Sequence, residues 1–209
     1  LTHKVILVNL CIKIFELNYP ITYLINTKIK YLMSNIQIAT FGGGCFWCVE
    51  AVIQRLKGVQ KLESGYSGGR FPNPTYKEVC GGLSGHAEVV QVTFDADTIS
   101  YHDLITIFMT THDPTTLNRQ GADRGTQYRS VIYFHDDEQK QVIEQVMEEL
   151  KDTFPDPIVT EVSPLGTFFV AEDYHQNYFN DNMGASYCRI VIDPKVQKLR
   201  SAYSDKLKV

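Results

Sequence analysis

The cysteines are the residues of this chain best suited to chemistry. Five are present in 209 residues, and only Cys45 and Cys48 lie close together in the sequence. An odd number of scattered cysteines is not typical of a disulfide-stapled secreted domain, so we expect a reducing compartment. Cys45 follows the run Gly42–Gly44 and opens a helical pattern. A thiol at a helix N-terminus faces unpaired N–H groups, which favours the thiolate and predicts a lowered pKa.

Glu88 is the carboxyl residue with the most informative position. It belongs to the segment AEVVQVTFD, whose period of two places Glu88 on the same face as Val90 and Val92. On that apolar face desolvation would raise its pKa and make it a general acid near neutral pH. The alternative is that Glu88 reaches water at the end of the strand. Phe46 and Trp47, beside Cys45, are either core aromatics or an apolar wall for a small soft group.

Other chemistries fit the sequence less well. The glycine-rich turn lacks the Lys-Ser or Lys-Thr of a P-loop and has no complete G-x-G-x-x-G. A single CxxC is too little for zinc, so we expect no metal, and His86 and His175 are expected to form hydrogen bonds around a pocket. A net charge of -4 gives no reason to expect nucleic acid. No apolar stretch approaches the ~20 residues of a membrane-spanning helix.

The elements that must position these residues follow the order β-α-β-β-α-β. Strands are predicted at 36–41, 87–95 and 128–134, and the segment 59–69 is predicted as a strand that runs into a flexible turn. A first helix is predicted from about Cys45, with Gly58 just after its end. A second helix is predicted from the apolar stripe Tyr101, Leu104, Ile105 and Phe108. A third is predicted from the stripe Val142, Ile143, Val146 and Leu150. In the first helix the polar face is predicted to hold Glu50, Gln54 and Lys57.

This order predicts an α+β fold, a ferredoxin-like two-layer sandwich. A single helical turn is expected at YKEV, and a cap from Asp136 for the last helix. Beyond Pro155 we expect one strand, at IVTEV, and an irregular C-terminal extension that wraps over the sandwich.

The first residues differ in composition from the rest. We predict that residues 1–32 are an N-terminal extension outside the fold, that Met33 is the natural start, and that residues 33–209 form one catalytic domain. Lys4 precedes the apolar segment VILVNL, but no cleavage site of the A-x-A type follows, so a signal peptide is not favoured. We therefore expect a cytoplasmic protein.

Several ordered motifs resemble those of the class A peptide methionine sulfoxide reductases. They are GCFWCVE (44–50), NPTYKEVC (73–80), GHAE (85–88), RQGADRGTQYRSVIYF (119–134) and AEDYHQNY (171–178), and the likeness extends from about residue 36 to residue 196. The resemblance implies an enzyme that reduces methionine-(S)-sulfoxide, in proteins or free, to methionine. It implies thioredoxin as the reductant, no cofactor, and oxidised proteins or peptides as substrates. The oligomeric state is open at the level of sequence, and a monomer is the default expectation.

The resemblance also assigns roles to individual residues. It implies that Cys45 attacks the sulfoxide sulfur and that Glu88 protonates the oxygen. It implies that Tyr76 and Tyr128 hold the oxygen by hydrogen bonds and that Asp123 helps to organise the site. Phe46 and Trp47 correspond to the pocket for the methyl group. Attack leaves a sulfenic acid on Cys45, which a second thiol condenses to a disulfide that thioredoxin reopens.

The identity of that second thiol is open at the level of sequence. The resemblance favours Cys188, in the segment SYC, whereas the CxxC spacing favours Cys48, because residues three apart lie on one helix face. A relay through both thiols is a third alternative. Cys80 is expected to be structural.

Two other functions compete with the reductase. One is a thioredoxin-like disulfide oxidoreductase that uses Cys45 and Cys48, and the other is a redox-sensing interaction module. The oxidoreductase hypothesis does not account for the segments GHAE and GTQYRS. Consumption of a methyl sulfoxide substrate distinguishes the three hypotheses.

Overall fold

The computed structural model describes residues 35–208, and every element below belongs to one unit, Ile36–Val209. The predicted extension of residues 1–32, with Cys11, and the proposed start at Met33 lie outside the described residues. None of the described helices is long and apolar enough to cross a membrane.

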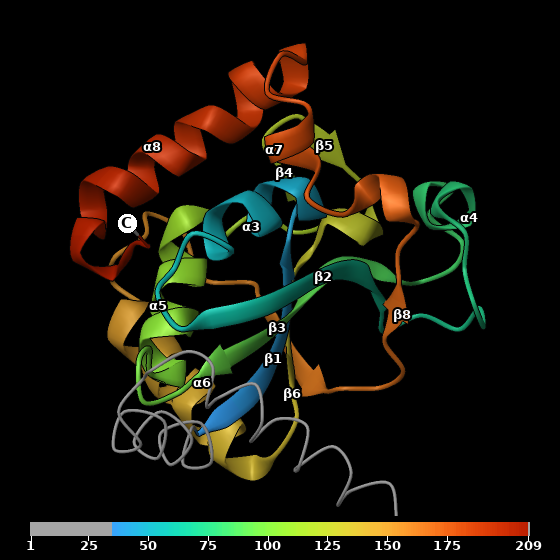
Figure 1. Cartoon of the computed structure of the whole chain (residues 1–209). Coiled ribbons are helices and arrows are strands. Elements are labelled where there is room, and N and C mark those ends of the chain that lie inside the picture. Colours follow the sequence, from blue (N-terminus) through green and yellow to red (C-terminus); the bar gives the residue numbers. More distant parts are fainter. Residues whose placement is uncertain (1–34, 209) are drawn as a thin grey trace, which may run out of the picture. The chain divides into compact units, whose positions relative to one another are not determined.

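Four antiparallel strands form the centre of the sheet and follow the predicted chain order. They are β1 (Ile36–Gly43), β2 (Val59–Ser67), β3 (Ala87–Asp95) and β6 (Ser130–Phe134), and they lie side by side in the order β6-β1-β3-β2. Figure 1 shows this sheet at the centre of the fold, with helices packed against it. The predicted α+β, ferredoxin-like fold is thus confirmed.

Two short strands extend this sheet at its edges. β7 (Glu161–Pro164) pairs with β6 in parallel, and β8 (Phe169–Val170) pairs with β2 in antiparallel orientation. The strand predicted at IVTEV therefore begins later than expected, because pairing starts only at Glu161, opposite Val131. A separate ribbon joins β4 (Arg119–Gln120) to β5 (Asp123–Arg124), and the 3-10 helix η1 (Thr126–Tyr128) follows.

The helices bury their apolar stripes in one main core. The helices of this part of the chain are α3 (Phe46–Ile53), α4 (Tyr76–Cys80), α5 (Tyr101–Thr111) and α6 (Asp137–Leu150). The predicted cap is present, because the Asp136 side chain accepts from the Gln139 amide at 2.8 Å. Ser100 caps α5 in the same way and accepts from the Asp103 amide. Val90 and Val92 of β3 face this core, whereas Val89 faces a smaller cluster on the other side of the sheet.

The C-terminal extension wraps over the helical side and is more regular than expected. It contains η2 (Asp173–His175), α7 (Tyr178–Asp181), the π-helical η3 (Cys188–Ile192), α8 (Asp193–Ala202) and η4 (Ser204–Lys206). α8 contacts both α3 and α5 and lies on their outer side (Figure 1). Val196 and Leu199 anchor it because they are buried in the main core.

Two predictions about α3 are wrong. The helix ends at Ile53, not at Gly58, because Leu56 leaves the helical path to form a bridge with Leu207 near the C-terminus. Glu50, expected on a solvent-exposed face, is 3% exposed, because the C-terminal extension covers that face. In both cases the cause is a contact with residues far along the chain.

Candidate active site

Cys45 lies at the junction between the central strand β1 and the helix α3. It is the N-cap residue of α3 and is 7% exposed. The junction requires glycine: a side chain on Gly42 would place its Cβ against the backbone carbonyl oxygen of Glu88, and Gly44 has a φ of +91°. The glycine run therefore brings the thiol close to the neighbouring strand β3.

Glu88 lies on the helix-facing side of β3, as the alternation predicts. Its side chain is 1% exposed, and its Oε2 accepts a hydrogen bond of 3.0 Å from the backbone N–H of Phe46, in the first turn of α3. Burial raises the pKa of Glu88 to about 8, and the charge of Asp123 adds to this. Within the described residues, Oε1 has no hydrogen-bond partner. Glu88 is thus a protonated carboxyl near neutral pH.

The predicted lowering of the Cys45 pKa is wrong for this structure. Burial raises the pKa of the Cys45 thiol, and its neighbours Cys48 and Glu88 raise it further. The first N–H of α3 is already paired with the Glu88 carboxyl, so it does not face the thiol. The hydrogen bond from Cys45 instead lowers the pKa of Cys48, to about 7, and the charge of Lys195 acts in the same direction.

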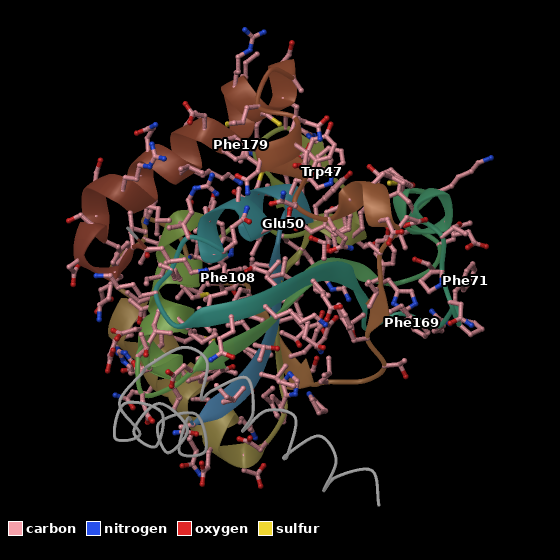
Figure 2. All side chains as sticks on the ribbon, viewed as in Figure 1. Trp47, Glu50, Phe71, Phe108, Phe169 and Phe179 are labelled. Carbon is pink, nitrogen blue, oxygen red and sulfur yellow. The ribbon has the colours of Figure 1, made fainter. Side chains whose placement is uncertain are left out.

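Phe46 and Trp47 form an aromatic wall with residues of the C-terminal extension. The Trp47 ring stacks on Tyr178, with 3.6 Å between ring centroids and 6° between planes. Its Nε1 donates to Nδ1 of His175 at 3.1 Å, and the His175 ring lies 5.0 Å from that of Phe46. Figure 2 shows Trp47 on α3 beside the segment that carries Phe179.

Tyr76 and Tyr128 come from separate segments and lie at the same site. Tyr76 begins α4, whose N-cap, Thr75, forms a capping box with Glu78. Burial raises the pKa of Tyr76 and of Tyr128, and the charge of Glu88 raises both further. Both hydroxyls therefore remain protonated hydrogen-bond donors at physiological pH. Cys80, expected to be structural, is exposed.

Asp123 is linked to the site through a tyrosine that the sequence reasoning did not single out. The Tyr187 hydroxyl donates to Oδ2 of Asp123 at 2.8 Å and lies 3.9 Å from Sγ of Cys48. The signal that could have identified it is its place in the segment SYC, beside Cys188. Asp123, Tyr187 and Cys48 thus form one polar chain.

Cys188 lies in the main core at the start of η3. It is fully buried, and burial together with the charge of Cys48 raises the pKa of its thiol. The structure therefore brings Cys188 into the electrostatic neighbourhood of Cys48.

Two buried or half-buried carboxylates, also missed from sequence, hold the C-terminal extension against the site. Glu50 of α3 accepts from the backbone amides of Asn177 at 2.7 Å and Tyr178 at 3.0 Å. Glu172 accepts from the amide of Tyr76 and from the hydroxyl of Tyr66, both at 2.9 Å. These bonds fix the position of the aromatic wall relative to α3 and α4.

The histidines within residues 35–208 form hydrogen bonds. His86 pairs with the Gly69 amide and the Phe71 carbonyl oxygen, and His175 pairs with Trp47. In the part of the chain that the structure describes, no group of three His, Cys, Asp or Glu side chains could hold a metal ion.

This fold and this site define a class of protein, an α+β oxidoreductase with several thiols beside a buried, protonated carboxyl. The profile of the peptide methionine sulfoxide reductases matches residues 37–207. The chain belongs to this family.

Individual relatives agree with the assignment. The peptide methionine sulfoxide reductase MsrA of Deinococcus radiodurans is 60% identical over 172 residues, which are 81% of this chain and 84% of the relative. The MsrA of Saccharolobus solfataricus is 51% identical over 83% of this chain and 98% of its own length. The predicted enzyme class, an oxidoreductase of the MsrA type, is thus confirmed.

Solved structures give the same result. Reduced Mxr1 from Saccharomyces cerevisiae is 34% identical, with a TM-score of 0.70 over 73% of this chain and 89% of Mxr1. Methionine sulfoxide reductase A of Corynebacterium diphtheriae is 35% identical, with a TM-score of 0.65 over 71% of this chain and 76% of its own.

Proposed function

We propose that this protein reduces methionine-(S)-sulfoxide, free or in oxidised proteins and peptides, to methionine, with Cys45 as nucleophile and Glu88 as proton donor. Sulfoxide reduction needs a nucleophile for sulfur and an acid for oxygen. The observation that carries the proposal is the buried carboxyl of Glu88, with a pKa of about 8, beside the Cys45 thiol. Family membership supports selectivity for one epimer, because separate enzymes reduce the two.

Substrate binding uses the aromatic wall and the two tyrosines. The sulfoxide methyl packs against Phe46 and Trp47, while the oxygen faces Glu88. The hydroxyls of Tyr76 and Tyr128, which stay protonated, donate hydrogen bonds to that oxygen and polarise the S–O bond.

The first chemical step reduces the sulfoxide and oxidises Cys45. Cys45 attacks the sulfoxide sulfur and loses its proton, Glu88 protonates the oxygen, and the S–O bond breaks as water leaves. Water then adds to the Cys45 sulfur, the bond between the two sulfur atoms breaks with its electron pair going to the methionine sulfur, and Glu88 regains its proton. The products are methionine and a sulfenic acid on Cys45, so that the substrate sulfur gains the two electrons that the cysteine sulfur loses. Asp123 and Tyr187 act on this step indirectly, because the Asp123 charge helps to keep Glu88 protonated.

For the second step, in which the Cys45 sulfenic acid becomes a disulfide, the contacts support the relay through both Cys48 and Cys188. Cys48 hydrogen-bonds Cys45 and lies three residues on, a spacing within the reach of a disulfide. Cys48 attacks the Cys45 sulfenic acid, which releases water and forms a Cys45–Cys48 disulfide. Cys188, near Cys48 and fully buried, then attacks the Cys48 sulfur and frees the Cys45 thiol.

We propose thioredoxin as the partner that reduces the final disulfide, and a monomer as the active form. The yeast relative Mxr1 has been solved in complex with Trx2, which supports a reductant of this class. A dithiol reductant reopens a protein disulfide by exchange, which needs no further cofactor.

The test counts methionine formed per enzyme from a peptide that carries methionine-(S)-sulfoxide, first without reductant and then with thioredoxin. The relay predicts about two equivalents for the wild type without reductant, since exchange to Cys188 frees Cys45 for a second attack. Cys45→Ser should form none, and Cys48→Ser and Cys188→Ser should each form about one. Cys11→Ser, which alters a cysteine outside the residues that the family profile matches, is the matched control and should behave as the wild type.

Each part of the proposal can fail separately. Methionine production by Cys45→Ser would remove Cys45 as the nucleophile. Equal rates with the (R)-sulfoxide peptide would remove the epimer preference. If Cys48→Ser still loses its sulfenic acid, as judged by dimedone trapping and mass, then Cys188 resolves Cys45 directly and the relay order is wrong.

A further inference from the structure

A small cavity lies behind Cys48, between the helices α3, α5 and α8. Its lining includes Cys48 and Val49 of α3, Phe108 of α5, His112 at the end of α5, and Lys195 of α8. Its volume of about 10 Å³ is the space of one water molecule. Lys195 is half-buried and is the residue that α8 contributes to this cavity. The C-terminal helix thus contributes Lys195 to the same cavity that Cys48 lines.

Among the charged and titratable groups around Cys48, Lys195 favours a negative charge on the Cys48 sulfur. His112 is no competing cation, because burial lowers its pKa to about 4 and its ring bonds Phe108 and Ser130. The other titratable groups that act on Cys48 or border its cavity are Cys45 on α3, Glu88 on β3, Asp123 on β5, Tyr187, Cys188 on η3, and Lys198 through its effect on His112. Asp123 opposes a negative charge on Cys48, whereas Lys195 favours it.

We propose that Lys195 is a positioning residue for the redox relay, which holds Cys48 as a thiolate ready to attack the Cys45 sulfenic acid. The inference rests on the proposed function, in which Cys48 is the first resolving thiol. In this step the Cys48 thiolate forms an S–S bond with Cys45, the S–O bond of the sulfenic acid breaks, and the oxygen leaves as hydroxide. The hydroxide becomes water by taking up the proton that Cys48 released to solvent when it ionised. Cys48 is oxidised and the Cys45 sulfur is reduced.

The position of Lys195 makes the redox relay depend on the packing of the C-terminal segment that contains η3 and α8. Lys195 precedes the buried anchor Val196, and Cys188 begins the π-helical turn that runs directly into α8. The same C-terminal segment therefore supplies the charge that prepares Cys48 and the thiol that later attacks it. Cys48 is ready for attack only when this segment is packed on α3 and α5.

The test follows the loss of water that accompanies conversion of sulfenic acid to disulfide, by rapid quench and mass spectrometry, between pH 5.5 and 9.5. The wild-type rate should rise through an inflection near the pKa of about 7 of Cys48. Lys195→Met should move this inflection up by about one pH unit. Because a thiol of higher pKa is also a better nucleophile, the variant should be about threefold slower below pH 7 and no slower above pH 9.

Three comparisons separate this role from a structural one. Lys195→Arg keeps the positive charge and should restore the wild-type inflection, while Lys198→Met, on the same helix, should leave it in place. A defect in packing would slow the Lys195→Met variant equally at every pH, which would overturn the proposal, as would an unchanged inflection. The burst of methionine that precedes resolution should be the same in all of these variants.

The proposed function can fail without reference to Lys195. If Cys48→Ser forms its disulfide at the wild-type rate, Cys48 is not the first resolving thiol, and the relay itself is wrong. If Cys48→Ser stalls and Lys195→Met keeps the wild-type pH profile, the relay stands and the role of Lys195 is wrong.

Discussion

Burial has the same effect on the two acids of the site, because it raises the pKa of both Glu88 and Cys45. Conversion of a sulfoxide to a thioether and water consumes two protons and two electrons. A site that keeps a carboxyl and a thiol protonated near neutral pH therefore holds the protons that the reaction requires. The cost is that Cys45 becomes a thiolate only as its proton is displaced during the reaction.

Glu88→Gln tests the role of the carboxyl as an acid. The amide can still accept a hydrogen bond from Phe46 but cannot release a proton, so methionine formation in a single turnover should fall by about 10²–10⁴. The wild-type rate should decline as the pH rises through about 8, where Glu88 deprotonates, and the residual rate of the variant should lack this decline. A variant within threefold of the wild type would show that another group supplies the proton.

The raised pKa of Glu88 also predicts a dependence of stability on pH. The folded protein holds the Glu88 proton more tightly than the unfolded chain, so between the ordinary glutamate pKa of 4.5 and about 8 the free energy of unfolding falls as the pH rises. Glu88→Gln removes this loss, and the variant should gain stability over the wild type at pH 9 relative to pH 5 in urea denaturation. Glu144→Gln, on an exposed part of α6, should show no such gain.

The residues of the site that the sequence could reveal are those within local motifs. Cys45, Phe46, Trp47 and Glu88 sit at a strand–helix junction or in an alternating strand, where neighbours in sequence define the surroundings. Tyr187, Glu172 and Lys195 were missed because they act from the C-terminal extension, and their partners lie in segments far away in the sequence. The resemblance to the family supplied Tyr76, Tyr128 and Asp123, which no local pattern singles out.

At the scale of elements, α3 depends on the C-terminal extension for its environment. The Glu50 side chain accepts from two backbone amides of that extension, and hydrogen bonds to a charged group contribute about 1.5–3 kcal/mol each. Figure 2 shows Glu50 on α3 on the side of the C-terminal segment that carries Phe179. The contact joins the helix of the nucleophile to the aromatic wall.

Glu50→Ala should therefore destabilise the fold and disorder the wall together. It leaves the amides of Asn177 and Tyr178 without their acceptor, and the free energy of unfolding should fall by about 2–5 kcal/mol in urea denaturation. The rate of methionine formation should fall as well. The same change at exposed Asp156 should alter stability by less than about 0.5 kcal/mol. Equal effects at the two positions would contradict the assigned role of Glu50.

The elements themselves were predictable where a period repeats several times. The strand at 87–95 and the helix stripe of Val49, Val52 and Ile53 match the structure, because in each the apolar side chains repeat at the period of the element and are buried in the main core. The end of α3 and the position of β7 were not predictable, because a bridge to Leu207 sets the first and pairing with β6 sets the second. Local sequence carries no information on either contact.

For the whole molecule, the family match and the described fold both begin well inside the chain. The match starts at residue 37 and β1 starts at Ile36. A protein that begins at Met33 should keep the wild-type rate of methionine formation and melting temperature. Insolubility of this protein, or a loss of more than a few degrees in melting temperature, would show that residues 1–32 support the fold.

The hydrogen bonds between Glu50 and the C-terminal extension can form only after the extension has been synthesised. Glu50 and Tyr178 are separated by 128 residues, and a ribosome adds about 5–20 residues per second, so on the order of ten seconds pass between their synthesis. During that interval the nascent chain carries Cys45 without the aromatic wall, the relay thiol Cys188 or Lys195. Activity therefore begins only after the C-terminal extension has been synthesised, and a chain truncated before this extension would contain the proposed nucleophile but could not turn over.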